Sequence, residues 1–452
     1  MYLLASDVPS VLTIVFLVLA VGLALSFEFV NGFHDTANAV ATVIYTNTLK
    51  PTIAVVWSGI WNLIGVLSSS GAVAFGIVAL LPVELVINVG SVAGFAMVFA
   101  LLLSAIIWNL GTWYLGLPAS SSHTLIGSIL GVGLANSLMS HAHTFGEGVN
   151  WMKAKDVGLA LLISPIVGFC AAALLLLLAK AVIKHPELYK APKGDEPPPW
   201  WIRGVLMLTC TGVSYAHGSN DGQKGMGLIV LILVGILPGM YALQMNTSVE
   251  TIKQISITAS ALAPAYAQKA NGASAEEADK TLSKYLKGSR PLSDSVYAAL
   301  AQKTTEISTE LQSMNSFKDL NEPQRRSLRT DCVLVSDTIK RLQKAGQFDA
   351  ALEKSSLGFS NSLKSLTEYI PDWVKYAVAL ALGLGTMIGW KRIVVTVGEK
   401  IGKQHLTYAQ GASAEMVAMA TILIADHFGL PVSTTHVLSS GVAGTMVANH
   451  GG

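Results

Sequence analysis

The chain has 452 residues, of which 52% are apolar and 13% charged. Soluble domains carry about 25% charged residues, so this composition excludes a disordered chain, a coiled coil and an ordinary soluble enzyme. The 30 basic and 28 acidic side chains leave a net charge of +2, which excludes a strong electrostatic field for nucleic acid. The three cysteines exclude a disulfide framework and show no metal-site spacing.

Half of the charged residues fall in one stretch, 251–370, and the remainder of the chain holds long uncharged runs. We therefore predict a soluble insert of amphipathic helices within a membrane protein. A hydrocarbon core requires about 20 apolar residues per helix. The predicted spans lie near 8–46 and 204–244, both broken, and near 52–72, 86–110, 117–138, 157–182, 373–390, 406–427 and 432–449.

Basic residues cluster in the loops after three of these spans, which places those loops in the cytoplasm by the positive-inside rule. The N-terminus and the insert are then predicted to lie on the outer side. The basic residues are Lys50, Lys180, Lys184, Lys190, Lys193, Arg203, Lys391, Arg392, Lys400 and Lys403.

Two motifs recur in the same order. Residues 32–38 (GFHDTAN) align with 218–224 (GSNDGQK), and 116–123 (GLPASSSH) align with 429–436 (GLPVSTTH). The loop charges give the two copies opposite membrane directions, an arrangement typical of secondary transporters built from inverted repeats with broken helices. We predict an all-α polytopic membrane protein of this kind.

The repeat divides the chain into a first repeat (1–184), a cytoplasmic loop (185–203), the start of the second repeat (204–250), the insert (251–370) and the rest of the second repeat (371–452). The counterpart of span 157–182 would fall near 470–495. The second repeat is therefore expected to lack its last span.

The Pro-x-Ser-Ser/Thr-Ser/Thr-His motifs place hydroxyls at helix starts, beside free backbone N–H groups and the positive end of the helix dipole. Two copies facing each other would surround a small tetrahedral anion. The alternative is that these residues only cap or pack helices. The candidate anion-binding residues are Ser120, Ser121, Ser122, His123, Ser433, Thr434, Thr435 and His436.

Asp35 and Asp221 lie inside apolar spans, where an ionised carboxylate costs several kcal/mol unless it is paired. The nearby glycines predict an unwound break whose carbonyls, with the carboxylate, coordinate a cation. Asn38 adds an amide oxygen one turn from Asp35. The alternative is a structural ion pair, for Asp221 with Lys224. Glu28 and Glu415 are further carboxylates within spans.

At these residues the sequence resembles the PiT family of inorganic phosphate transporters. The family's duplicated Gly-x-Asn-Asp-x-x-Asn and Leu-Pro-x-Ser-x-Thr-His signatures look like the four segments above, and the run 31–45 looks closest to the proteobacterial low-affinity members. The resemblance implies phosphate symport across the bacterial inner membrane, coupled to protons. The cargo would be neutral complexes of phosphate with a divalent metal such as magnesium. It also makes a homodimer plausible, and the outer side becomes the periplasm.

The resemblance assigns Asp35, Asn38, Asn220, Asp221 and Glu415 to the coupling cation and the Ser/Thr motifs to phosphate. Position 34 is histidine where the family usually has asparagine. Lys224 stands where the repeat expects the counterpart of Asn38. We hypothesise that its ammonium replaces a bound sodium by an internal ion pair with Asp221, which would make transport sodium-independent.

Other functions remain open at this stage. A sodium-coupled phosphate or sulfate symporter, an anion channel and a membrane-embedded enzyme are the alternatives. The enzyme ranks last because the insert holds no matched His/Asp/Ser or Cys/His set. We expect no resident cofactor or metal. No arginine lies in any predicted span, which suits release of a low-affinity substrate.

Overall fold

The computed structural model describes residues 11–81, 91–139, 146, 149–192, 194, 196–275, 277–288, 290–399 and 406–450, and among them every regular element is a helix. Lys193, Lys400 and Lys403 lie outside the described residues. The first half comprises α1 (Val11–Tyr45), α2 (Pro51–Ser68), α3 (Ala72–Val78), α5 (Val92–Tyr114), α6 (Ser121–Met139), α7 (Trp151–Val182) and the short η1 (Pro186–Tyr189).

The second half begins with α8 (Trp200–Ile236) and the short α9 (Pro238–Tyr241). It ends with α15 (Asp372–Met387), α16 (Lys391–Glu399), α17 (Tyr408–His427) and α18 (Thr434–His450). Four described helices, α1, α2, α5 and α7, are each long and apolar enough to cross a membrane. The prediction of an all-helical membrane protein is confirmed.

Helices α1 and α8 run without a break through Gly32 and Gly218, so the predicted unwound segments in spans 8–46 and 204–244 are wrong. A Cβ atom on Gly32 would lie 2.3 Å from the Leu382 carbonyl oxygen, and one on Gly218 would lie 2.1 Å from that of Asn62. Both glycines are therefore needed for close helix packing, and the carbonyls of these helices are not freed to bind a cation.

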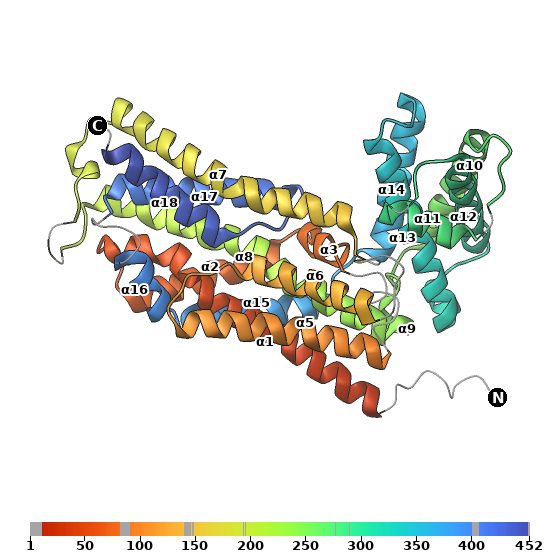
Figure 1. The fold of residues 1–452 in the computed structure, drawn as a ribbon, viewed down its shortest axis with the longest axis horizontal. Coiled ribbons are helices and arrows are strands. Elements are labelled where there is room, and N and C mark those ends of the chain that lie inside the picture. Colours follow the sequence, from red (N-terminus) through yellow and green to blue (C-terminus); the bar gives the residue numbers. More distant parts are fainter. Residues whose placement is uncertain are drawn as a thin grey trace.

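The interruptions occur instead at the Ser/Thr motifs. Each motif lies at the tip of a helical hairpin, between α5 and α6 in the first repeat and between α17 and α18 in the second. Figure 1 places α6 toward the end of the bundle that carries the insert and α18 toward the opposite end. The tips contact each other, because the Ser122 hydroxyl donates to the Val432 carbonyl oxygen at 2.7 Å.

The two repeats are intertwined. Helix α7 of the first repeat packs along α18 of the second, and α15 of the second repeat packs on α1 and α2 of the first. The contact between α7 and α18 is close because a Cβ atom on Gly444 would lie 2.1 Å from the Phe169 carbonyl oxygen. This exchange of helices holds both hairpins against the central pair α1 and α8.

The insert is a helical bundle with its own apolar core. Its helices are α10 (Val249–Lys269), α11 (Ala278–Lys287), α12 (Asp294–Gln312), η2 (Phe317–Asp319), α13 (Glu322–Lys344) and α14 (Ala350–Thr367). In Figure 1 it stands at the end of the bundle where α1 begins, and α16 and the end of α18 lie at the other end.

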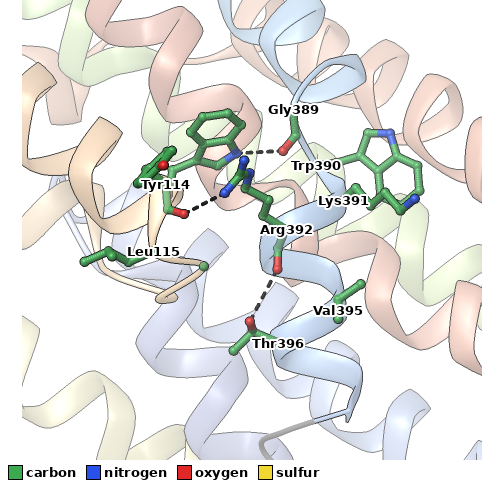
Figure 2. A pocket seen from close by; sticks show the side chains of 10 residues that line it. Tyr114, Leu115, Gly389, Trp390, Lys391, Arg392, Val395 and Thr396 are labelled. Carbon is green, nitrogen blue, oxygen red and sulfur yellow. Dashed lines mark hydrogen bonds between the residues drawn. The ribbon is translucent and has the colours of Figure 1, made fainter.

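A pocket of about 610 Å³ lies at this second end, between the end of α5 and α16 (Figure 2). The Arg392 guanidinium stands over the Trp113 ring, 5.2 Å from its centroid, and donates to the Tyr114 carbonyl oxygen at 2.8 Å. Aromatic and basic side chains in this arrangement are typical of a membrane interface. None of the predicted site residues lines this pocket.

Candidate substrate and ion site between the two repeats

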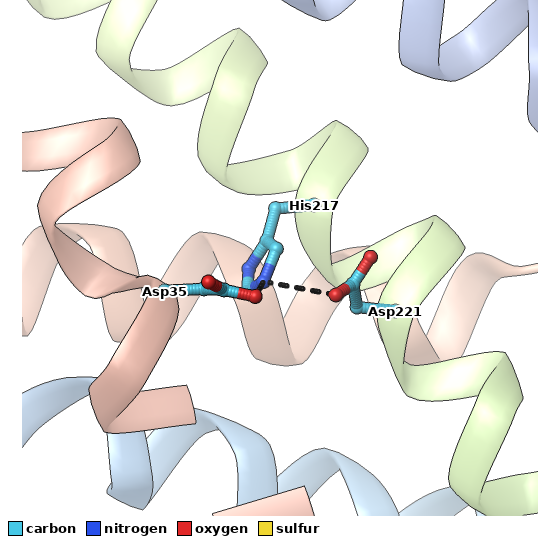
Figure 3. A group of neighbouring side chains, drawn as sticks. All are labelled: Asp35, His217 and Asp221. Carbon is cyan, nitrogen blue, oxygen red and sulfur yellow. Dashed lines mark ion pairs between the residues drawn. The ribbon is translucent and has the colours of Figure 1, made fainter. Parts of the chain in front are cut away.

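Two carboxylates from the two repeats lie close together at the contact between α1 and α8. His217 lies between them, with its Nε2 atom 3.8 Å from Asp35 and 3.5 Å from Asp221 (Figure 3). Its Nδ1 atom is 2.8 Å from the Asn62 side-chain oxygen, which fixes the ring. The His34 Nδ1 atom lies 3.6 Å from the Asp35 carboxylate. All of these side chains are buried.

Both hairpin tips reach Asp35. The Ser121 hydroxyl donates to one carboxylate oxygen at 3.1 Å, and the Thr435 hydroxyl donates to the other at 2.7 Å. The Asn38 amide lies 3.4 Å from Asp35 and donates to the Thr435 hydroxyl at 2.9 Å. Thr435 also lies 3.4 Å from the Ala119 carbonyl oxygen of the first tip.

The second repeat builds a related arrangement around Asp221, in which Lys224 takes the place of Asn38 and neither carboxylate oxygen accepts a hydrogen bond from a described tip hydroxyl. The Lys224 ammonium lies 2.7 Å from Asp221 and donates to the Ser122 hydroxyl at 2.5 Å. Ser122 in turn donates to the Val432 carbonyl oxygen. These residues are the repeat counterparts of Asn38, Asp35, Thr435 and Ala119. The inverted repeat thus extends to the pairing of residue 38 or 224 with the facing tip, as an amide in one repeat and an ammonium in the other, whereas the hydroxyl bonds to Asp35 have no counterpart at Asp221. The ion pair named as the alternative for Asp221 is present.

The remaining motif residues start the two helices or face each other. Ser120 and Ser433 accept from the backbone N–H groups of His123 and His436, as expected of N-caps. The two histidine rings lie 4.5 Å apart between their centroids. The buried Thr434 hydroxyl has no hydrogen-bond partner among the described residues and is therefore available to a ligand.

Two residues assigned to the coupling cation have hydrogen-bond partners other than the carboxylate pair. Asn220 accepts from the Val432 N–H and donates to the Leu430 carbonyl oxygen, so it holds the second tip. Glu415 on α17 is buried and accepts from the Thr209 hydroxyl at 2.5 Å.

Sequence reasoning missed His217. Its position four residues before Asp221 places both on one helix face, and this spacing was an available signal. Its repeat counterpart is Asn31, so repeat symmetry gave no indication of a histidine there. Asp35, His217 and Asp221 each offer one ligand atom, and these atoms lie within 4.8 Å of one another. The set is able to hold a cation; the sequence analysis predicted a coupling cation at Asp35 and Asp221 but not the histidine between them.

Comparisons with known proteins agree with this geometry. Residues 31–452 match the family described as the phosphate transporter family. The chain is 43% identical to the low-affinity inorganic phosphate transporter PitA of Escherichia coli K12, covering 96% of this chain and 90% of that protein. It is 28% identical to a probable low-affinity inorganic phosphate transporter of Bacillus subtilis, over 97% of this chain and 86% of that protein.

The fold is similar to a solved structure titled "The sodium-dependent phosphate transporter". The TM-score is 0.50 at 19% identity, over 96% of this chain and 90% of that one. The relatives are named as transporters and not as enzymes. The chain belongs to the phosphate transporter family.

Proposed function

We propose that this protein carries inorganic phosphate across the membrane with low affinity, by alternating access, as a symport with protons. The observation that carries the proposal is the meeting of two Ser/Thr hairpin tips, one from each inverted repeat, at a single pair of buried carboxylates. Inverted repeats that enclose a central site are the usual architecture of secondary transporters.

The two tips supply an anion site without a fixed arginine. The N-termini of α6 and α18 point their free backbone N–H groups and dipoles toward the same region. The hydroxyls of Ser121 and Thr435 are bonded to Asp35 in this structure. Phosphate binding must exchange these bonds for bonds to the substrate, so the tips separate when the site opens to one side.

Charge explains why a cation must accompany phosphate. Ionised Asp35 and Asp221 together carry two negative charges, and the Lys224 ammonium offsets one of them. A phosphate dianion would add two more in a buried site, which is strongly unfavourable. Protons, or a divalent metal bound to phosphate, offset this charge. Carboxylate oxygens suit Mg²⁺, so Asp35 and Asp221 are the residues that would contact a metal-phosphate cargo.

Lys224 supports coupling to protons over sodium. Its ammonium stands where the first repeat has the Asn38 amide, and it pairs with Asp221 at 2.7 Å. Because this ammonium already neutralises the Asp221 carboxylate, no sodium ion is required to pair with it.

We place the protein in a bacterial inner membrane, with the N-terminus and the 251–370 insert as periplasmic parts. The support is that the start of α1 and the insert lie at one end of the bundle, whereas α16, with Lys391 and Arg392, lies at the other. The positive-inside rule assigns the basic end to the cytoplasm. A homodimer remains part of this proposal, by analogy with the family.

The test is uptake of radiolabelled phosphate into proteoliposomes that contain the purified chain. An inward proton gradient without sodium is compared with a sodium gradient at equal pH, each with and without magnesium. We expect accumulation with protons alone, and a higher rate with magnesium. Accumulation only with sodium would overturn the coupling. Net current without uphill accumulation would indicate a channel, and equal competition by sulfate would overturn the substrate.

A further inference from the structure

One buried carboxylate has no role in the site described so far. Glu28 lies on α1 seven residues before Asp35, on the same face and about 10 Å along the helix. This displacement is toward the end that carries the insert (Figure 1). Glu28 is 0% exposed. A carboxylate buried in a membrane helix is expensive, so it requires a functional explanation.

The carboxyl group of Glu28 is only half satisfied. Its Oε2 atom accepts a long bond from the Asn31 amide at 3.4 Å, and its Oε1 atom has no hydrogen bond of ordinary geometry among the described residues, so that the Gly225 backbone N–H contributes only a weak one to the carboxyl group. The side chain packs on Gly225 of α8, where a Cβ atom would lie 2.5 Å from Oε1. Glycine at this position therefore makes room for the carboxyl group directly beside Lys224.

The charged groups that act on Glu28 come from α8. They are Asp221 and Lys224, and its own helix supplies only the Asn31 amide. The neighbouring turn of α1 packs on α15 through backbone, since a Cβ atom on Gly385 would lie 2.1 Å from the Phe29 carbonyl oxygen. Glu28 thus has one cationic neighbour among the described residues, and that cation is already paired with Asp221.

Glu28 and Lys224 both lie at positions where the two repeats differ in charge. The offset that relates Asp35 to Asp221 places Ser214 at the position of Glu28, and Asn38 at that of Lys224. The first repeat carries an acid and the second a base where the other repeat has a neutral polar side chain. Both lie at the same contact between α1 and α8.

We infer that Glu28 is the proton-binding group of the transport cycle, an inference that rests on the proposed coupling to protons. A proton from water at the insert end binds Oε1, and Lys224 then pairs with Asp221, as in this structure. When the proton leaves to water on the opposite side, the Glu28 carboxylate competes with Asp221 for the ammonium. Because Lys224 also bonds to Ser122, loss of the proton changes the charge and hydrogen bonding at the phosphate tip.

The test compares two activities of Glu28→Gln in proteoliposomes. Phosphate exchange at equal pH on both sides requires no net proton movement, whereas accumulation driven by a pH gradient does. We expect exchange within twofold of the unmodified protein and accumulation reduced at least tenfold. The ratio of protons to phosphate, measured with an internal pH dye, should fall by one. Glu28→Asp should restore part of the accumulation.

Two further variants sharpen the result. Gly225→Ala pushes the carboxyl group away from α8 and should reduce accumulation as Glu28→Gln does. Ser26→Ala, at an exposed hydroxyl of the same helix, should change neither activity. An unchanged proton ratio in Glu28→Gln would overturn the inference, as would equal loss of exchange and accumulation in both Glu28 variants. Failure of the unmodified protein to accumulate phosphate with protons would instead overturn the proposed function.

Discussion

Replacement of Lys224 by asparagine tests whether the ammonium substitutes for a bound cation. Lys224 and Asp221 are both 0% exposed and lie 2.7 Å apart. Removal of one member of a buried ion pair costs about 3 to 5 kcal/mol, because the other charge is left unpaired. Asparagine is the repeat counterpart, and Asn38 shows that an amide fits beside the aspartate and the hydroxyl of the facing tip.

A sodium ion that binds the unpaired oxygens of the Asp221 carboxylate and the new amide would recover part of this lost stability. At 100 times its dissociation constant, a ligand stabilises the folded state by about 2.7 kcal/mol. Sodium should therefore recover more than half of the lost stability. We expect Lys224→Asn to unfold at lower temperature in potassium than in sodium, and its phosphate uptake to rise at least tenfold with sodium. In the unmodified protein, neither the unfolding temperature nor the phosphate uptake should depend on whether sodium or potassium is present.

Two matched variants separate a cation site from a general loss of charge. Lys224→Met removes the ammonium but supplies no oxygen ligand, so sodium should not rescue it. The double variant Lys224→Asn, Asp221→Asn lacks the carboxylate and should likewise ignore sodium. Uptake by Lys224→Asn that is indifferent to sodium would refute the reasoning, and so would equal rescue of the methionine variant.

Three further predictions follow from packing, hydrogen bonding and burial. Gly218→Ala forces a Cβ atom against the Asn62 carbonyl and should lower the free energy of unfolding by about 1 to 3 kcal/mol in detergent, whereas Gly204→Ala on the same helix, with open space around it, should not. Thr434→Val removes a hydroxyl that has no partner among the described residues, so the fold should stay intact. The phosphate KM should rise about tenfold or more, the equivalent of about 1.5 to 3 kcal/mol. Thr445→Val is the control, and an unchanged KM in Thr434→Val would contradict the assignment. In the insert, burial raises the pKa of Asp331 to about 6 despite Lys303 at 3.0 Å, so the folded state holds a proton that the unfolded chain releases, and stability should fall by roughly 2 kcal/mol from pH 4 to 6. The measurement is the rate at which 4,4′-dithiodipyridine labels the buried Cys332, divided by the rate for the unfolded chain. This relative rate should be lower at pH 4.5 than at pH 7, and Asp331→Asn should abolish the difference. Equal relative rates at the two pH values in the unmodified protein would refute the prediction.

Much of the fold could be predicted from the sequence because the relevant signals are local. Uncharged runs of about 20 residues define membrane helices, and the amphipathic pattern of 251–370 defines the helices of the insert. The repeated motifs identified the carboxylates Asp35 and Asp221 and the Ser/Thr tips, because side chains of these types are costly in a membrane unless they serve a site.

The remaining features depended on contacts between residues far apart in the chain. Whether Gly32 breaks a helix or admits a neighbour depends on where the Leu382 carbonyl lies, and no local pattern encodes this. His217 acquires its role only when α1 brings Asp35 against α8, and Glu28 only when Gly225 opens a space beside Lys224. Local sequence thus determined the elements and the chemical groups. Tertiary packing decided which groups meet, because in a helical bundle a side chain's neighbours come mostly from other helices.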